Sequence, residues 1–197
     1  MAAGMQPSGV GYVAEGAAAK AVPEEWGPAS HTAEQRMLLQ VIQPGLVGLM
    51  DGSVSTLAPL FAAAFVTGKP KETFLVGLAA AVGAGISMAF SEAMSDTGEL
   101  TGRGKPVRRG LITGFMTFIG GVGHSLPFII VIGFISSRHE QLSVALVLAY
   151  FVVGIELISI AYVRFKFFKM SFWLSFLQVV VGGALVFASG VLIGSRG

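Results

Sequence analysis

Five long apolar stretches separated by short polar segments dominate the hydropathy pattern of this chain. They run over residues 46–66, 73–94, 110–135, 142–163 and 172–193. Each is close to the roughly 20 residues that a helix needs to cross about 30 Å of hydrocarbon. None shows the two-residue alternation of a strand, and open sheet edges are not tolerated in lipid. The pattern therefore predicts an all-α polytopic membrane protein with five transmembrane helices.

The composition agrees with a lipid environment and excludes several other classes. The chain is 53% hydrophobic and only 12% charged, whereas a soluble domain carries about 25% charged residues. Its 27 glycines suit close contacts between helices in a bilayer. The net charge of +2 and the lack of a basic patch with interleaved aromatics argue against a nucleic-acid partner. With no Cys, thiolate metal sites and disulfides are excluded.

The chain before the first apolar stretch divides at about residue 31. Residues 1–31 are rich in Gly, Pro and Ala and carry little charge, which predicts a flexible tail. They lack the basic start and unbroken apolar core of a signal peptide. Thr32 and Gln35 have capping-box spacing, so a helix should begin near Thr32 and run on to a bend near Pro44. Residues 32–197 then form one transmembrane domain.

Lys and Arg are distributed unevenly between the two ends of the predicted helices. The side that holds the tail carries nine of them: Lys20, Arg36, Arg103, Lys105, Arg108, Arg109, Arg164, Lys166 and Lys169. The opposite side carries four, which are Lys69, Lys71, Arg138 and Arg196. Because basic loops stay on the cytoplasmic side, this distribution predicts a cytoplasmic N-terminus and a C-terminus on the far side.

Three acids and a thioether mark the predicted helices at a similar depth. At about 1.5 Å per helical residue, Asp51, Met88, Glu92 and Glu156 fall within roughly 3–11 Å of the cytoplasmic surface. Placing an acid in hydrocarbon costs at least about 2.5 kcal/mol, so its presence indicates a charged partner, a water-filled cavity or a functional role. Asp51 is the hardest to explain by packing, because close helix contact does not require a carboxylate. It is also the candidate for exchanging a proton for a metal ion.

One face of the second predicted helix combines sulfur and oxygen ligands. Gly85, Met88, Glu92 and Asp96 recur at three- and four-residue spacing, which places them on one stripe. A thioether with carboxylates suits a borderline ion such as Fe²⁺, whereas carboxylates alone suit Mg²⁺ or Ca²⁺. A single Met is nevertheless more often packing than ligand. The candidate metal ligands are Asp51, Met88, Glu92 and Glu156, with Asp96 and His124 as accessory residues.

Structural interpretations of the other polar residues remain open at this point. Asp96 can be a solvated acid at a helix end. Glu156 can pair with Arg164 or with a basic residue of another helix. His124, close to Pro127, can hydrogen-bond a carbonyl that the proline leaves free.

Motifs in the first two spans resemble those of the vacuolar iron transporter family. They are Gly48-x-x-Asp51-Gly52 and residues 83–88 (GAGISM). The chain is most similar to the transporter half of bacterial membrane-bound ferritins. That likeness covers about residues 40–195 and includes residues 87–93 (SMAFSEA), 102–104 (GRG) and 120–127 (GGVGHSLP).

The resemblance implies export of Fe²⁺ or Mn²⁺ from the cytoplasm in exchange for protons. It implies a homodimer with the first helix at the two-fold axis, in which Asp51 and Met88 carry the translocation site. Iron is then the transported substrate and no cofactor is bound permanently. The implied setting is the bacterial inner membrane, with lipid and a ferritin-like iron donor as partners. Here the loop after the second span is short and basic, where plant members have a Glu-rich insertion.

A second hypothesis is a protein with the same membrane domain that does not transport ions. In it the chain is a non-transporting scaffold that docks a separate ferritin-like partner through its tail. An intramembrane enzyme is not predicted. Ser125 adjoins His124 and faces another way on a helix, and no His-x-x-Glu-His or Gly-x-Ser-x-Gly pattern occurs.

Overall fold

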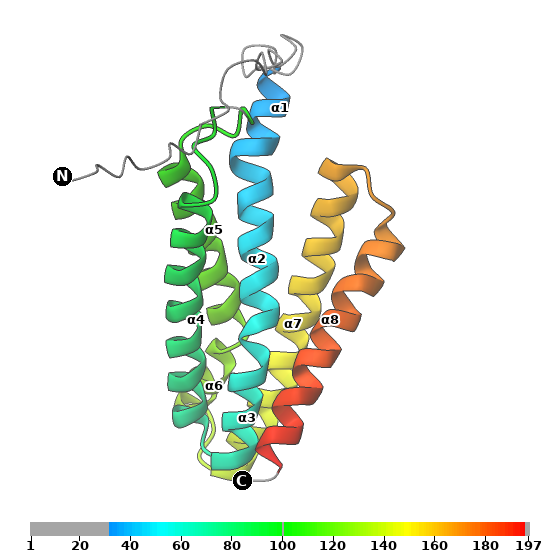
Figure 1. Cartoon of the computed structure of the whole chain (residues 1–197). Coiled ribbons are helices and arrows are strands. Elements are labelled where there is room, and N and C mark those ends of the chain that lie inside the picture. Colours follow the sequence, from blue (N-terminus) through cyan, green and yellow to red (C-terminus); the bar gives the residue numbers. More distant parts are fainter. Residues whose placement is uncertain (1–31, 100, 196–197) are drawn as a thin grey trace, which may run out of the picture.

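The computed structural model describes residues 32–99 and 101–195, and all regular structure in these residues is helical (Figure 1). Four helical rods are long and apolar enough to cross a membrane, and a bent pair of helices is a fifth if its two parts form one span. The prediction of an all-α chain with apolar, membrane-length helices is confirmed. The predicted tail, residues 1–31, lies outside the described residues.

The first rod joins four consecutive helical segments. They are α1 (Ala33–Met37), the π-helical turn η3 (Leu38–Ile42), α2 (Gln43–Ser55) and α3 (Leu57–Thr67). The later helices are α4 (Pro70–Ala93), α5 (Pro106–Gly123), α6 (Leu126–Ile130) with the 3₁₀ turn η4 (Val131–Gly133), α7 (Arg138–Phe168) and α8 (Phe172–Gly194). α5 and α7 extend beyond the predicted spans 110–135 and 142–163, because helical hydrogen bonding continues past the apolar residues into polar ones.

The start of the first rod follows the sequence prediction. Thr32 and Gln35 form a capping box, in which the Gln35 N–H donates to Thr32 Oγ1 at 3.2 Å and the Thr32 N–H donates to Gln35 Oε1 at 2.8 Å. A π-helical turn lies just before Pro44, where the sequence predicts a bend. There the Gln43 N–H reaches back five residues to the Leu38 carbonyl, just before the proline that has no N–H to donate.

The third predicted span is broken in its middle. α5 and α6 meet at an angle of 48°, with His124 and Ser125 at the break and Pro127 in the first turn of α6. Ser125 Oγ donates to the Gly121 carbonyl at 2.9 Å. A proline just after the break accounts for the interruption, since its ring and missing N–H prevent the α-helix from continuing.

Glycines bring α2, α4 and α5 into close contact. A Cβ on Gly48 would collide with the Thr113 carbonyl, and one on Gly52 would collide with the Thr117 carbonyl. On the other side of α5, a Cβ on Gly85 of α4 would lie 2.9 Å from the Gly114 carbonyl. The small residues of the sequence motif therefore serve helix packing, as expected for a bilayer.

The largest apolar core lies in the half of the bundle away from α1. There Phe61 of α3 is fully buried beside Phe128 of α6. Phe61 stacks on Tyr150 of α7 with ring centroids 5.2 Å apart and meets Phe187 of α8 edge-on at 4.9 Å. This core joins the broken third span to the first and last rods.

The outside of the bundle is apolar, and the rods alternate in direction. Phe90, Phe115 and Leu185 are each more than 60% exposed, which suits lipid rather than water. The α4–α5 connection and the α7–α8 turn lie at the same end as α1, and the end of α8 lies at the other (Figure 1). The described helices are compatible with an integral membrane protein, while the predicted cytoplasmic side remains a prediction.

Candidate functional site

Asp51 is an isolated carboxylate on α2. It is half-buried and has no hydrogen-bond or ion-pair partner among the described residues. It opens onto a hollow of about 390 Å³, called here the α2–α8 hollow, which is lined by Met50, Asp51, Val54, Ser55, Gln178, Val179, Gly182 and Val186. Successive residues on a helix point about 100° apart. Asp51 can therefore face α8 while Gly48 and Gly52 pack on α5.

Gln178 is a polar residue of this hollow that the sequence analysis did not single out. Its Oε1 accepts a hydrogen bond from Arg164 Nη2 at 2.9 Å. Arg164 also donates to the Met170 sulfur at 3.5 Å. Arg164 therefore does not pair with Glu156, which was one alternative drawn from the sequence. The signal that could have identified this position is a glutamine within an otherwise apolar helix.

Met88 lies half-buried on α4 but is not among the residues that line the α2–α8 hollow. It continues the buried side of α4, which runs through Gly77, Ala81 and Gly85. Within one chain, the structure does not bring Met88 into the surroundings of Asp51.

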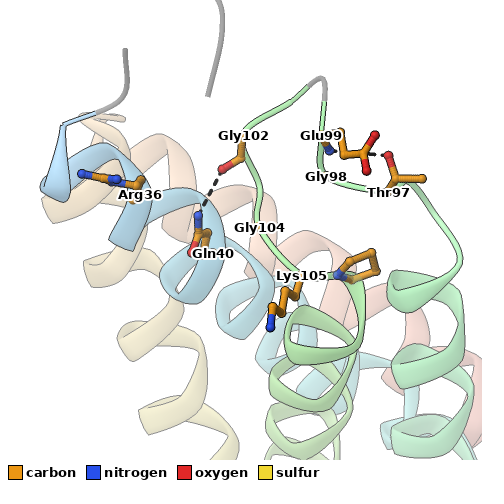
Figure 2. A pocket seen from close by; sticks show the side chains of 9 residues that line it. Arg36, Gln40, Thr97, Gly98, Glu99, Gly102, Gly104 and Lys105 are labelled. Atoms are coloured by element: carbon orange, nitrogen blue, oxygen red, sulfur yellow. Dashed lines mark hydrogen bonds between the residues drawn. The ribbon is translucent and has the colours of Figure 1, made fainter. Parts of the chain in front are cut away.

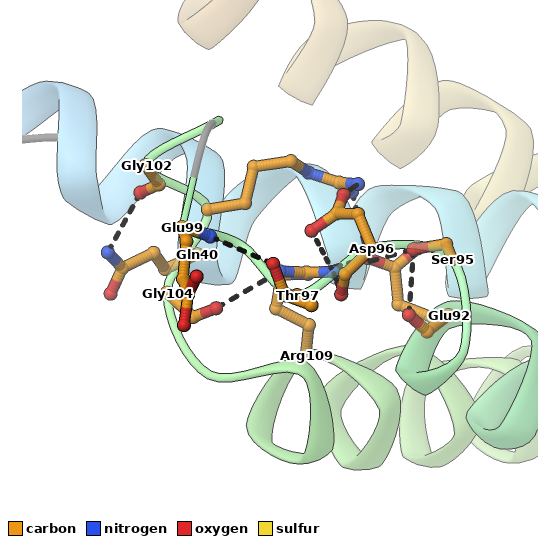
Figure 3. A network of polar contacts seen from close by, with 10 residues as sticks. Gln40, Glu92, Ser95, Asp96, Thr97, Glu99, Gly102, Gly104 and Arg109 are labelled. Atoms are coloured by element: carbon orange, nitrogen blue, oxygen red, sulfur yellow. Dashed lines mark hydrogen bonds and ion pairs between the residues drawn. The ribbon is translucent and has the colours of Figure 1, made fainter. Parts of the chain in front are cut away.

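Glu92 and Asp96 belong to a cluster of four charges at the end of α4 (Figure 3). Glu92 Oε1 accepts from Arg103 Nη2 and from Arg109 Nε, both at 2.8 Å. Asp96 accepts from Arg103 Nη1 at 2.9 Å and from Arg109 Nη2 at 3.1 Å. This charge cluster satisfies both acids, so the expectation that Asp96 is a merely solvated helix-end acid is wrong.

Arg109 is the buried centre of the charge cluster. Its side chain is 1% exposed, compared with 20% for Arg103. It also donates to the Gly104 carbonyl at 3.2 Å and to Ser95 Oγ at 3.4 Å, which closes the α4–α5 connection over the helix ends. In the sequence, both arginines stand out only as part of the basic side of the chain. The available signal was the pair of acids Glu92 and Asp96, which lie 17 and 13 positions before Arg109.

Asp96 lies beyond the end of α4, outside the apolar span. Burial would raise the pKa of this carboxyl. The hydrogen bond from Arg103 and the positive charges of Arg109 and Arg103 outweigh that effect and lower the pKa below its ordinary value.

A hollow of about 460 Å³ opens beside the charge cluster, between η3 and the α4–α5 connection (Figure 2). Arg36 and Lys105 bring positive charge to its wall, and Glu99 brings a negative one. Gln40 Nε2 donates to the Gly102 carbonyl at 3.2 Å and ties the connection to the π-helical turn. Side chains of η3, of the α4–α5 connection and of α5 thus hold this end of the bundle together.

His124 and Glu156 form a pair inside the bundle. His124 is fully buried, with Nδ1 3.1 Å from Glu156 Oε2 and Nε2 2.9 Å from Thr56 Oγ1. The expected bond from His124 to a free carbonyl near Pro127 is therefore wrong. The structure supports the alternative in which Glu156 pairs with a basic residue of another helix. Glu156 lies beside the α5–α6 break.

The ionisable candidate residues thus occupy three separate environments, and Met88 lies outside all three. These environments are the α2–α8 hollow, the charge cluster and the His124–Glu156 pair. In the part of the chain that the structure describes, no three His, Asp or Glu side chains converge as a metal site. Because Glu156 is paired with His124, we leave it out of the proposed metal ligands.

Comparison with known proteins adds no relative: no family model, no curated protein and no solved structure matches this chain. The resemblance to vacuolar iron transporters therefore remains a prediction from motifs.

Proposed function

We propose that this protein is a proton-coupled transporter that exports a divalent metal ion, Fe²⁺ or Mn²⁺, from the cytoplasm. The observation that carries the proposal is the environment of Asp51, a half-buried carboxylate in an apolar rod without a described partner. Such a group is costly in hydrocarbon and is retained where it binds a cation or a proton. The α2–α8 hollow beside it has room for a hydrated ion.

In this proposal Asp51 binds the ion and exchanges it for a proton, and Met88 supplies a softer ligand. Sulfur together with carboxylate favours Fe²⁺ or Mn²⁺ over Ca²⁺. One chain alone keeps Met88 away from the α2–α8 hollow. In the proposed homodimer with α2 at its two-fold axis, each Asp51 faces its own copy across the axis, so that two carboxylates meet at one site.

Glu92 and Asp96 are the proposed entry residues at the cytoplasmic end. Arg103 and Arg109 occupy both acids in the closed arrangement. Arg103 is the more exposed of the two arginines and lies on the connection rather than on a helix, so it can leave first. An arriving cation then competes with the Arg103 guanidinium for the two carboxylates.

Transport in proteoliposomes tests the proposal. The vesicles hold an iron-sensitive dye and a pH dye, and Fe²⁺ is added outside under anaerobic conditions. The wild-type chain should carry metal inward with an opposite flow of protons. Asp51→Asn should reduce metal flux by at least about 10-fold to 100-fold, the loss that mutation of even an outer-shell partner of a metal ligand typically causes.

Glu140→Gln is the matched control, because Glu140 is an exposed acid in the first turn of α7, far from the three environments. It should transport like the wild type. Equal metal and proton fluxes for Asp51→Asn and the wild type contradict the mechanism. The absence of flux in the wild-type chain contradicts the function itself.

A further inference from the structure

The His124–Glu156 pair lies where two helical rods are interrupted. Thr56 stands at the α2–α3 junction, His124 at the α5–α6 break and Glu156 on the continuous α7. Their side chains form one chain of contacts from the Gly52 carbonyl through Thr56 and His124 to Glu156. This arrangement connects three rods in the interior of the bundle.

The hydroxyl of Thr56 determines which nitrogen of His124 carries hydrogen. Thr56 Oγ1 donates its single hydrogen to the Gly52 carbonyl at 2.8 Å, so towards His124 it can only accept. With the Thr56 hydrogen on the Gly52 carbonyl, Nε2 of His124 is the donor. The contact between Nδ1 and Glu156 Oε2 then needs one further hydrogen, which is held by an imidazolium or by a protonated carboxyl.

Few other charged residues of the described chain lie near the His124–Glu156 pair. Among the described residues, Glu156 is the acid within ion-pair distance of His124. Asp51 of α2 opens instead onto the α2–α8 hollow, and α8 carries no charged residue. The remaining charged residues of α4, α5 and α7 lie towards the ends of those helices: Lys71, Glu72, Glu92, Arg108, Arg109, Arg138, His139, Glu140, Arg164 and Lys166.

With one shared proton the pair is neutral in either form. Without it, a net negative charge is left inside the bundle and the Nδ1 lone pair faces a carboxylate oxygen. Both effects are unfavourable in a medium of low dielectric constant. The proton can leave readily only when another positive charge arrives.

We propose that His124 and Glu156 form a proton-binding site, separate from Asp51, which holds one shared proton in the metal-free protein and releases it when a divalent cation enters the bundle. Release replaces attraction by repulsion between α7 and the α5–α6 break, so it also loosens that contact. The release step rests on the proposed metal transport, whereas the shared proton does not.

The shared proton is tested by nitrogen-15 NMR of the full chain, labelled at histidine, in lipid nanodiscs at neutral pH. His124→Gln assigns the signals. In the wild type, Nε2 should carry hydrogen and Nδ1 should show a proton shared with an acid. Glu156→Gln should leave a neutral ring with hydrogen on Nε2, and Glu140→Gln should match the wild type. An Nε2 without hydrogen, or an Nδ1 signal unchanged in Glu156→Gln, overturns the proposal.

The release step is tested by adding Mn²⁺ to the same samples in weak buffer with a pH dye. The wild type should release about one proton per chain more than Glu156→Gln, because metal binding displaces protons from its surroundings. Equal release overturns this step. Should Glu156→Gln fail to fold, His124→Gln takes its place with the same expected difference. A wild type that neither binds nor carries metal overturns the proposed function, and the NMR result still decides the shared proton.

Discussion

Asp51 and Glu92 are both acids of the apolar helices, and their surroundings are opposite. Glu92 accepts from two guanidinium groups at 2.8 Å, one of them fully buried. Asp51 has no partner in the described part of the chain and opens onto the α2–α8 hollow. Glu92 stabilises the fold through its two arginines and can bind a cation only after Arg103 leaves, whereas Asp51 is available to bind a cation directly. The difference separates an acid that first serves the fold from one that is free from the start.

The largest expected effect comes from removing the centre of the charge cluster. Arg109→Ala leaves Glu92 and Asp96 partly uncompensated and opens a cavity at the helix ends, so it should lower the free energy of unfolding by about 3–5 kcal/mol. Thermal unfolding in detergent measures the loss. Arg108→Ala, at the exposed neighbouring position, should change stability little. Similar losses for both variants contradict the structural role of the cluster.

Neutralising Glu92 and Asp51 in separate variants compares the contributions of the two acids to stability. Glu92→Gln weakens two charged hydrogen bonds and should destabilise the protein by about 1.5–3 kcal/mol. Asp51→Asn removes no described contact and relieves the cost of an unpartnered charge in an apolar rod, so it should not destabilise the protein. Chemical denaturation of both variants in the same detergent checks the difference. A larger loss for Asp51→Asn points to a structural partner of that acid.

The glycines beside Asp51 provide a test of packing on the opposite face of α2. In Gly52→Ala the new methyl group meets the Thr117 backbone carbonyl, so α2 and α5 must separate. Overpacking of this kind should cost about 1–3 kcal/mol. Gly154→Ala is the matched control, since a Cβ there meets nothing within 4 Å. Thermal melting of the two variants should therefore differ clearly.

The smallest effect is the pH dependence that Asp96 contributes. Its pKa is lower in the folded protein than in the unfolded chain, so the unfolded chain takes up the proton first as pH falls. The stabilisation by Asp96 is complete above about pH 4, the ordinary pKa of an aspartate, and is lost below it. Melting temperatures of Asp96→Asn should thus fall less steeply than those of the wild type on acidification. Parallel pH profiles contradict this assignment.

Apart from the break in the third, the predicted spans lie largely within the helices, because each apolar stretch is about as long as the hydrocarbon it must cross. The capping box at Thr32 was also predictable, because its two residues are only three positions apart. The π-helical turn before Pro44 and the position of the break at His124 were not. Both depend on how the chain accommodates a proline inside a rod that is packed on its neighbours.

By itself the sequence determined the apolar helices, their alternating direction and the presence of ionisable groups within or beside them. Hydropathy and local spacing are enough for these features, since each is set by residues close together along the chain. Only the tertiary structure decided which acids are satisfied. Glu92 meets Arg109 across 17 positions and Glu156 meets His124 across 32. Such partners are chosen by the packing of separate helices, and the same packing leaves Asp51 without one in the described chain.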